Sequence, residues 1–138
     1  MDKFKKSIIQ FYTEYILDLK RVHFLTFFVA LVDFWWAFIF ILPINTYATS
    51  KSFSIISSLI SEELLAVFVF ALGFGLLFFI SKKHVINLRF MVILNELFWF
   101  FISFSFAFSN PLSTGTGIYF LISFVCGVIY LRLRETRT

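Results

Sequence analysis

Long apolar runs alternate with short polar segments along this chain. The runs cover residues 24–42, 64–80, 90–108 and about 115–132. A helix rises about 1.5 Å per residue, so a run of this length spans roughly 28 Å, close to the hydrocarbon thickness of a bilayer. The pattern therefore predicts an all-α fold: an integral membrane four-helix bundle, with a transmembrane domain over residues 24–133.

The polar segment between the first two runs has signals of its own. Pro43 is expected to end the first helix, because proline cannot continue one. Residues 44–63 are rich in serine with scattered apolar positions, which predicts a loop holding a short interfacial helix. Ser61, followed by Glu62 and Glu63, is a good start for the second spanning helix, since acids favour the positive end of the helix dipole.

The first 23 residues are too charged for a signal peptide. Their apolar residues recur at helical spacing, which is typical of an amphipathic helix lying on the cytoplasmic membrane surface. A cytoplasmic helix that docks a partner protein is the alternative. Residues 134–138 are expected to form a short basic tail. The predicted apolar face consists of Phe4, Ile8, Phe11, Tyr12, Tyr15 and Leu19.

The composition supports a membrane protein. Of 138 residues, 60% are hydrophobic and only 14% are charged, whereas a soluble domain has about 25% charged residues. A chain this small and apolar cannot hide its apolar surface in one soluble core. The one cysteine, Cys126, excludes an internal disulfide and any metal site built from several cysteines. We expect no metal and no cofactor.

The basic residues indicate the orientation. Eleven of the twelve lie on one side of the predicted membrane, and only Lys51 lies on the other. By the positive-inside rule, both termini are then cytoplasmic, and we expect the bacterial plasma (inner) membrane. The net charge of +4 is explained by this topology, so no nucleic-acid partner is expected. The residues expected to contact anionic lipid headgroups or a partner are Lys3, Lys5, Lys6, Lys20, Arg21, Lys82, Lys83, Arg132 and Arg134.

Two acids lie inside the predicted spans. Asp33 is central in the first, and Glu96 lies in the inner half of the third with Asn95 beside it. An acid at the centre of a span costs about 3 kcal/mol on insertion, and such residues are often functional. The two acids are expected at similar depth. Because no basic residue lies within a span, we expect one or both to hold a proton.

Polar residues also recur at seven-residue spacing on the last two spans. The two stripes are Glu96, Ser103 and Asn110, and Thr116, Ser123 and Tyr130. Facing each other, they would form either a proton or cation path or a set of hydrogen bonds between helices. We favour the hydrogen bonds, because no second charge completes a relay.

Small and aromatic residues suggest how the helices pack. Small residues four apart let membrane helices approach closely. Trp35, Trp36 and Trp99 lie near mid-depth, which favours packing within the bundle or between subunits. Tyr119 and Tyr130 are expected in the outer and inner aromatic belts. The small pairs are Ala71 with Gly75, Ser103 with Ala107, and Ser123 with Gly127.

These features predict a small non-enzymatic subunit of a homo-oligomer or a larger membrane complex. No nucleophile pair, metal-ligand spacing or phosphate-binding glycine loop points to an enzyme. One alternative is an oligomeric pore or an ion- or proton-translocating protein, which resembles phage holins in size and layout. The other is a membrane sensor or effector of a bacterial defence module.

Overall fold

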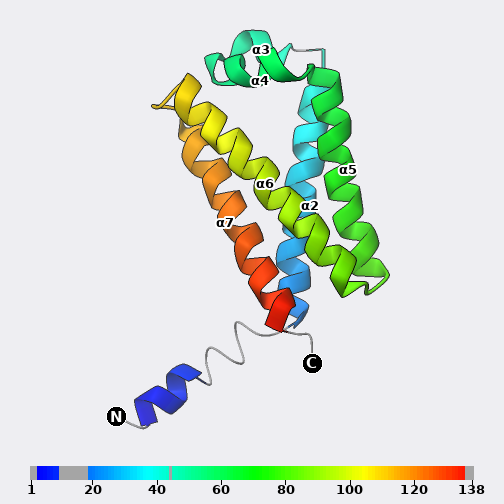
Figure 1. The fold of residues 1–138 in the computed structure, drawn as a ribbon, viewed down its shortest axis with the longest axis vertical. Helices are drawn as coiled ribbons and strands as arrows, with labels where there is room; N and C mark the ends of the chain where they lie inside the picture. Colours follow the sequence, from blue (N-terminus) through cyan, green and yellow to red (C-terminus); the bar gives the residue numbers. More distant parts are fainter. Residues whose placement is uncertain (1–2, 10–18, 44, 136–138) are drawn as a thin grey trace.

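The computed structural model describes residues 3–9, 19–43 and 45–135, and its secondary structure in these ranges is helical. Four long helices dominate it (Figure 1). Each of the four is long and apolar enough to cross a membrane, which confirms the predicted number of candidate spans. They are α2 (Leu19–Ile41), α5 (Glu62–Ser81), α6 (Val85–Ser109) and α7 (Thr114–Glu135).

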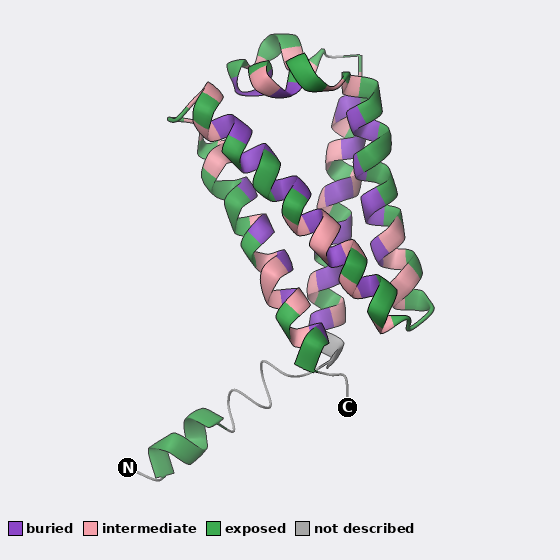
Figure 2. Ribbon diagram, in the orientation of Figure 1, coloured by how far each residue is buried: buried purple, intermediate pink, exposed green. Residues whose placement is uncertain are grey.

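The four helices run up and down as a bundle. The most extensive pairings join α2 to α5 and α6 to α7, and contacts of α5 with α6 and of α2 with α7 link the two pairs. Figure 2 shows buried positions on the inward faces and exposed positions on the outward faces. The outward faces are apolar, as the exposed side chains of Phe24, Phe68, Phe100 and Phe124 illustrate. Outward faces that are apolar over their length suit a lipid environment.

Three short helical segments lie across one end of the bundle (Figure 1). They are α3 (Thr46–Thr49), the 3-10 helix η1 (Lys51–Phe53) and α4 (Ser54–Leu59). Phe53 and Ile56 point inward and are buried. The short helix expected in this segment is therefore present in several pieces, and these pieces cover the end of the core.

The helix ends agree with their local signals. Ser61 caps α5, since its hydroxyl accepts a hydrogen bond from the Leu64 N–H at 3.4 Å. Helix α6 begins at Val85, five residues before the predicted span, because the apolar residues after the α5–α6 turn allow the helix to extend. Glu96 is consequently near the middle of this 25-residue helix rather than close to its start.

The N-terminal boundary also differs from the prediction. As described, helix α2 spans Leu19–Ile41, so residues 19–23 are continuous with the helix of the first predicted span. Residues 3–9 are helical with exposed side chains. Residues 10–18 of the predicted amphipathic helix, and residues 136–138 of the predicted tail, lie outside the described ranges. Helix α7 includes Arg134 and Glu135, the first two residues of the predicted tail.

Candidate functional site

The centre of the bundle contains a buried acid. Asp33 of α2 has no exposed surface. Its Oδ1 accepts a hydrogen bond of 3.0 Å from the indole Nε1–H of Trp99 on α6. Gly73 of α5 faces Asp33. A Cβ added at this glycine would lie 3.0 Å from the Asp33 Cβ and 3.2 Å from the Ala30 carbonyl oxygen. The absence of a side chain at Gly73 therefore lets α5 approach the acid closely.

Two oxygen atoms at this centre are buried without a hydrogen-bond partner among the described residues. One is Oδ2 of Asp33 and the other is Oδ1 of Asn95. The amide nitrogen of Asn95 donates to the Met91 carbonyl oxygen at 3.2 Å, within its own helix. Asn95 precedes Trp99 by one helical turn, so both unpartnered oxygens belong to residues on the same inward side of the bundle.

Glu96 is half-buried and lies against α7. A Cβ added to Gly127 would lie 3.1 Å from the Glu96 Oε1, so this glycine makes room for the carboxyl group. The thiol of Cys126, one residue earlier, is buried. The two acids belong to different helix pairs, because Asp33 lies on α2 of the α2–α5 pair and Glu96 lies on α6 of the α6–α7 pair.

The polar stripes of α6 and α7 face each other. The Ser123 hydroxyl donates to the Glu96 carbonyl oxygen at 3.1 Å, and the Ser103 hydroxyl donates to the Thr116 carbonyl oxygen at 2.8 Å. Both acceptors are backbone atoms of the facing helix. Between these two levels the stripes thus hold the helices together through hydrogen bonds. Asn110 and Tyr130, which lie at the far ends of the two stripes, have no cross-helix hydrogen bond of this kind in the described structure.

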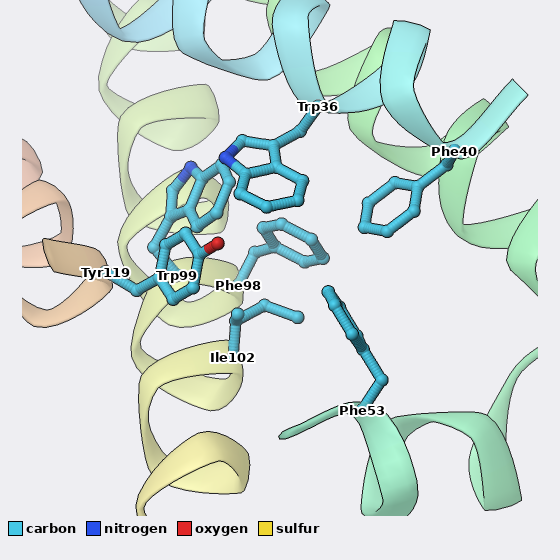
Figure 3. A pocket seen from close by; sticks show the side chains of 7 residues that line it. All are labelled: Trp36, Phe40, Phe53, Phe98, Trp99, Ile102 and Tyr119. Carbon is cyan, nitrogen blue, oxygen red and sulfur yellow. The ribbon is translucent and has the colours of Figure 1, made fainter. Parts of the chain in front are cut away.

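A small cavity lined mainly by aromatic rings lies between Trp99 of α6 and Phe53 of η1 (Figure 3). Its volume is about 10 Å³, roughly the space of one water molecule. Trp99 connects it to Asp33, and Phe53 enters it from η1. Rings therefore separate the acid from this end of the bundle. The cavity is lined by Trp36, Phe40, Phe53, Phe98, Trp99, Ile102 and Tyr119.

Tyr119 belongs to this core and not to an aromatic belt. It is 5% exposed, and its ring stacks on the Trp99 indole with centroids 5.3 Å apart and planes at 18°. The belt prediction was wrong, because the rings of Trp36, Trp99 and Phe106 enclose the Tyr119 ring within the bundle. Trp36 also packs inward, with its ring 5.4 Å from that of Tyr119. Trp35, in contrast, is 62% exposed on the outer face of α2.

An outward hollow runs between α6 and α7. It has a volume of about 340 Å³ and contains the small residues Ser103, Ala107 and Gly117. Gly117 has no neighbouring atom within 4 Å of an added Cβ. We call this hollow the α6–α7 groove; its lining residues are Phe100, Ser103, Phe104, Ala107, Thr116, Gly117 and Phe120.

The predicted small pairs differ in their positions. Ser123 and Gly127 face α6, and Ser103 and Ala107 line the groove. On α5, Ala71 is exposed, and the close approach to α2 is made by Gly73. The sequence prediction missed Gly73 and the role of Trp99 as the partner of Asp33.

The predicted surface lysines and arginines gather at one end of the bundle or on the N-terminal segment. Lys82 and Lys83 are exposed in the α5–α6 turn, and Arg134 is exposed at the end of α7. Arg132 is mostly buried and forms a 3.5 Å ion pair with Glu135. Lys20 and Arg21 lie in the first turn of α2, and their side chains are not described. Exposed positions on residues 3–9 include Lys3, Lys5 and Lys6.

The described residues contain no group of three or more histidine, cysteine, aspartate or glutamate side chains that could hold a metal ion. Comparison of the chain with protein-family models, curated proteins and solved structures gave no match.

Proposed function

We propose that this protein is a non-enzymatic membrane subunit that assembles into a homo-oligomer or a larger membrane complex. The observation that carries the proposal is that polar groups in the core form hydrogen bonds between helices. The Asp33 carboxyl binds the Trp99 indole, and the Ser103 and Ser123 hydroxyls bind carbonyl oxygens of the facing helices. These groups join the helices of the bundle.

Such bonds suit a scaffold. In a bilayer, apolar burial does not drive helices together, and an interhelical hydrogen bond contributes about 0.6 kcal/mol on average and up to about 1.7 kcal/mol. The bonds of Ser103 and Ser123 are two helical turns apart, and each reaches a backbone carbonyl of the other helix. Together they fix the register of α6 against α7 and support a rigid surface for assembly.

The α6–α7 groove supports a contact with another membrane helix. Small residues at membrane helix interfaces let backbones approach. Ala107 and Gly117 provide such a surface between flanking phenylalanines, and a Cβ added at Gly117 would meet no atom within 4 Å. A helix seated in the groove would cover this glycine.

The proposed orientation follows from charge. The α5–α6 turn, the start of α2 and the end of α7 share one end of the bundle (Figure 1), and this end carries Lys82, Lys83 and Arg134. Lys51 lies in η1, at the opposite end. We place the basic end in the cytoplasm of a bacterium, with four spans across the plasma membrane.

Cysteine cross-linking in native membranes tests the assembly. The Cys126→Ala background with Gly117→Cys places a single thiol in the groove, and Cys126→Ala with Trp35→Cys places one on the outer face of α2 as a matched control. We expect a cross-link at position 117 and little at position 35. A dimer-sized product indicates a homo-oligomer, and a larger heterogeneous product indicates another subunit. Equal cross-linking at both positions, or none at position 117, contradicts the proposal.

A second candidate function is proton or cation translocation through an oligomeric pore. It is favoured by the unpartnered oxygens of Asp33 and Asn95, because buried acceptors without donors are common along ion and proton paths. Flux into liposomes, measured with the wild type and with Asp33→Asn and Glu96→Gln, separates the two functions. Flux that falls in these variants while assembly is retained favours translocation. Absence of flux in the assembled wild type favours the subunit.

A further inference from the structure

A second hollow opens at the basic end of the bundle. Its volume is about 320 Å³, and it lies where the start of α2, the end of α5 and the start of α6 meet. Leu88, which is 2% exposed, lies at its buried side, and the exposed Lys83 lies at its rim. The hollow therefore combines an apolar base with a polar edge; its lining residues are His23, Phe79, Ile80, Lys83, Val85 and Leu88.

Lys83 is held at the rim by an unusual backbone conformation. Its φ is 56°, in the left-handed region that favours glycine. The turn is closed by hydrogen bonds from the His84 N–H to the Phe79 carbonyl oxygen at 3.2 Å and from the Lys83 N–H to the Ile80 carbonyl oxygen at 3.1 Å. Glycine would fit this position without strain. Lysine at this position makes the turn less stable than glycine would, and it places a primary ammonium group beside the hollow.

The charges around the hollow favour an anion. Among the described residues, its lining includes Lys83 and the imidazole of His23 but no carboxylate. Lys82 precedes Lys83 in the same turn but does not line the hollow, and its ammonium lies 6.0 Å from the centre of the Phe78 ring. Because Phe78 does not line the hollow either, the Lys82 side chain lies away from the hollow. Lys82 is therefore the matched control for Lys83. An anion with an apolar tail fits both the charge and the apolar base.

We infer that this hollow binds an anionic phospholipid. The phosphate oxygens would accept hydrogen bonds from the Lys83 ammonium and the His23 ring, and the upper acyl chain would lie along Phe79, Ile80 and Val85. Basic pockets between membrane helices on the cytoplasmic side are suited to anionic headgroups. The inference rests on the proposed orientation, in which this end of the bundle faces the inner leaflet, and it adds a specific lipid ligand to the proposed subunit.

Native mass spectrometry of the full-length protein in detergent tests the site. The probes are phosphatidylglycerol, phosphatidylcholine and inorganic phosphate, each added at the same concentration. We expect the wild type to retain phosphatidylglycerol in preference to phosphatidylcholine, and Lys83→Gly to weaken this retention about fivefold. Glycine suits the left-handed turn, so this variant should fold at least as well as the wild type. Lys82→Gln should retain the lipid as the wild type does.

The outcomes are distinct. Equal retention of phosphatidylglycerol by Lys83→Gly and the wild type overturns the inference. An equal loss of phosphatidylglycerol in Lys82→Gln and Lys83→Gly also overturns it, because the lipid would then bind through diffuse surface charge. Displacement of the lipid by inorganic phosphate at equal concentration also overturns it, because the site would then bind the free ion. The same spectra report the number of chains. Loss of lipid preference in an intact oligomer refutes the lipid site alone. Lipid retention by a single chain refutes the homo-oligomer and leaves the lipid site standing.

Discussion

The hydrogen bond between Trp99 and Asp33 makes a quantitative prediction. Trp99→Phe keeps an aromatic ring at the position but removes the indole N–H that Asp33 Oδ1 accepts at 3.0 Å. Asp33 Oδ2 already lacks a partner in the described structure, so the variant leaves the whole carboxyl group buried without a donor. Leaving a buried acceptor unsatisfied costs about 1–3 kcal/mol. Trp99→Phe should therefore lower the free energy of unfolding by an amount in this range.

A double-mutant cycle with Asp33→Ala isolates the bond from the loss of indole packing. When the acid is absent, Trp99→Phe loses only ring contacts. We expect a coupling energy between the two positions of about 0.6 kcal/mol, the mean for hydrogen bonds between membrane helices, and no more than about 1.7 kcal/mol, the largest value measured. Asp33→Asn should preserve the bond, because its amide oxygen accepts the same N–H.

The assay is reversible unfolding in mixed micelles of a mild detergent and sodium dodecyl sulfate, followed by far-ultraviolet circular dichroism. This signal reports helix content, so it does not depend on the tryptophan that is replaced. The reasoning is refuted if Trp99→Phe lowers the free energy of unfolding equally in the wild-type and Asp33→Ala backgrounds, since the coupling energy would then be zero.

Three further predictions concern other parts of the bundle. Gly73→Ala should destabilise the protein by about 1–2 kcal/mol because its Cβ would press on rigid atoms of α2, whereas Gly117→Ala, at an open position, should be neutral or slightly stabilising in the same unfolding assay. Phe53→Ala should cost about 3–5 kcal/mol, because the buried ring packs 4.9 Å from that of Phe106, while Leu59→Ala, at a site that is 66% exposed, should change stability little. Burial and the charge of Glu62 raise the pKa of Tyr47 to about 12 from 10.0. The unfolded chain releases this proton at lower pH than the folded chain, so the free energy of unfolding should fall as the pH rises from 10 towards 12. Tyr47→Phe should reduce that fall in unfolding curves measured across this range.

Much of the fold follows from the sequence because its signals are local. Hydropathy predicts the four long apolar helices, and Ser61 with its two following acids predicts the start of α5. The sequence also identified Asp33 and Asn95 as polar residues inside apolar runs, and the structure buries both. These features depend on the period of a single helix or on one helix end, so no knowledge of helix packing is needed.

The contacts between helices required the structure. Asp33 and Trp99 are 66 positions apart, and their bond depends on the rotation of α2 against α6, which hydropathy does not determine. Gly73 and Gly75 lie two positions apart and hence on different sides of α5, but composition alone does not show which one faces α2. Tyr119 lies near the end of an apolar run, where a belt residue is expected, yet aromatic rings of α2 and α6 bury it.

The most direct test of the central claim is the number of chains per particle in the membrane. The full-length protein would be labelled with one fluorophore, reconstituted at low density into liposomes, and counted by single-molecule photobleaching. For a homo-oligomer we predict more than one bleaching step in most particles, falling to one step when Gly117→Leu fills the α6–α7 groove. For a subunit of a larger complex, the same count is made after extraction with native lipid and its partners. Single chains without partners in both preparations would contradict the account.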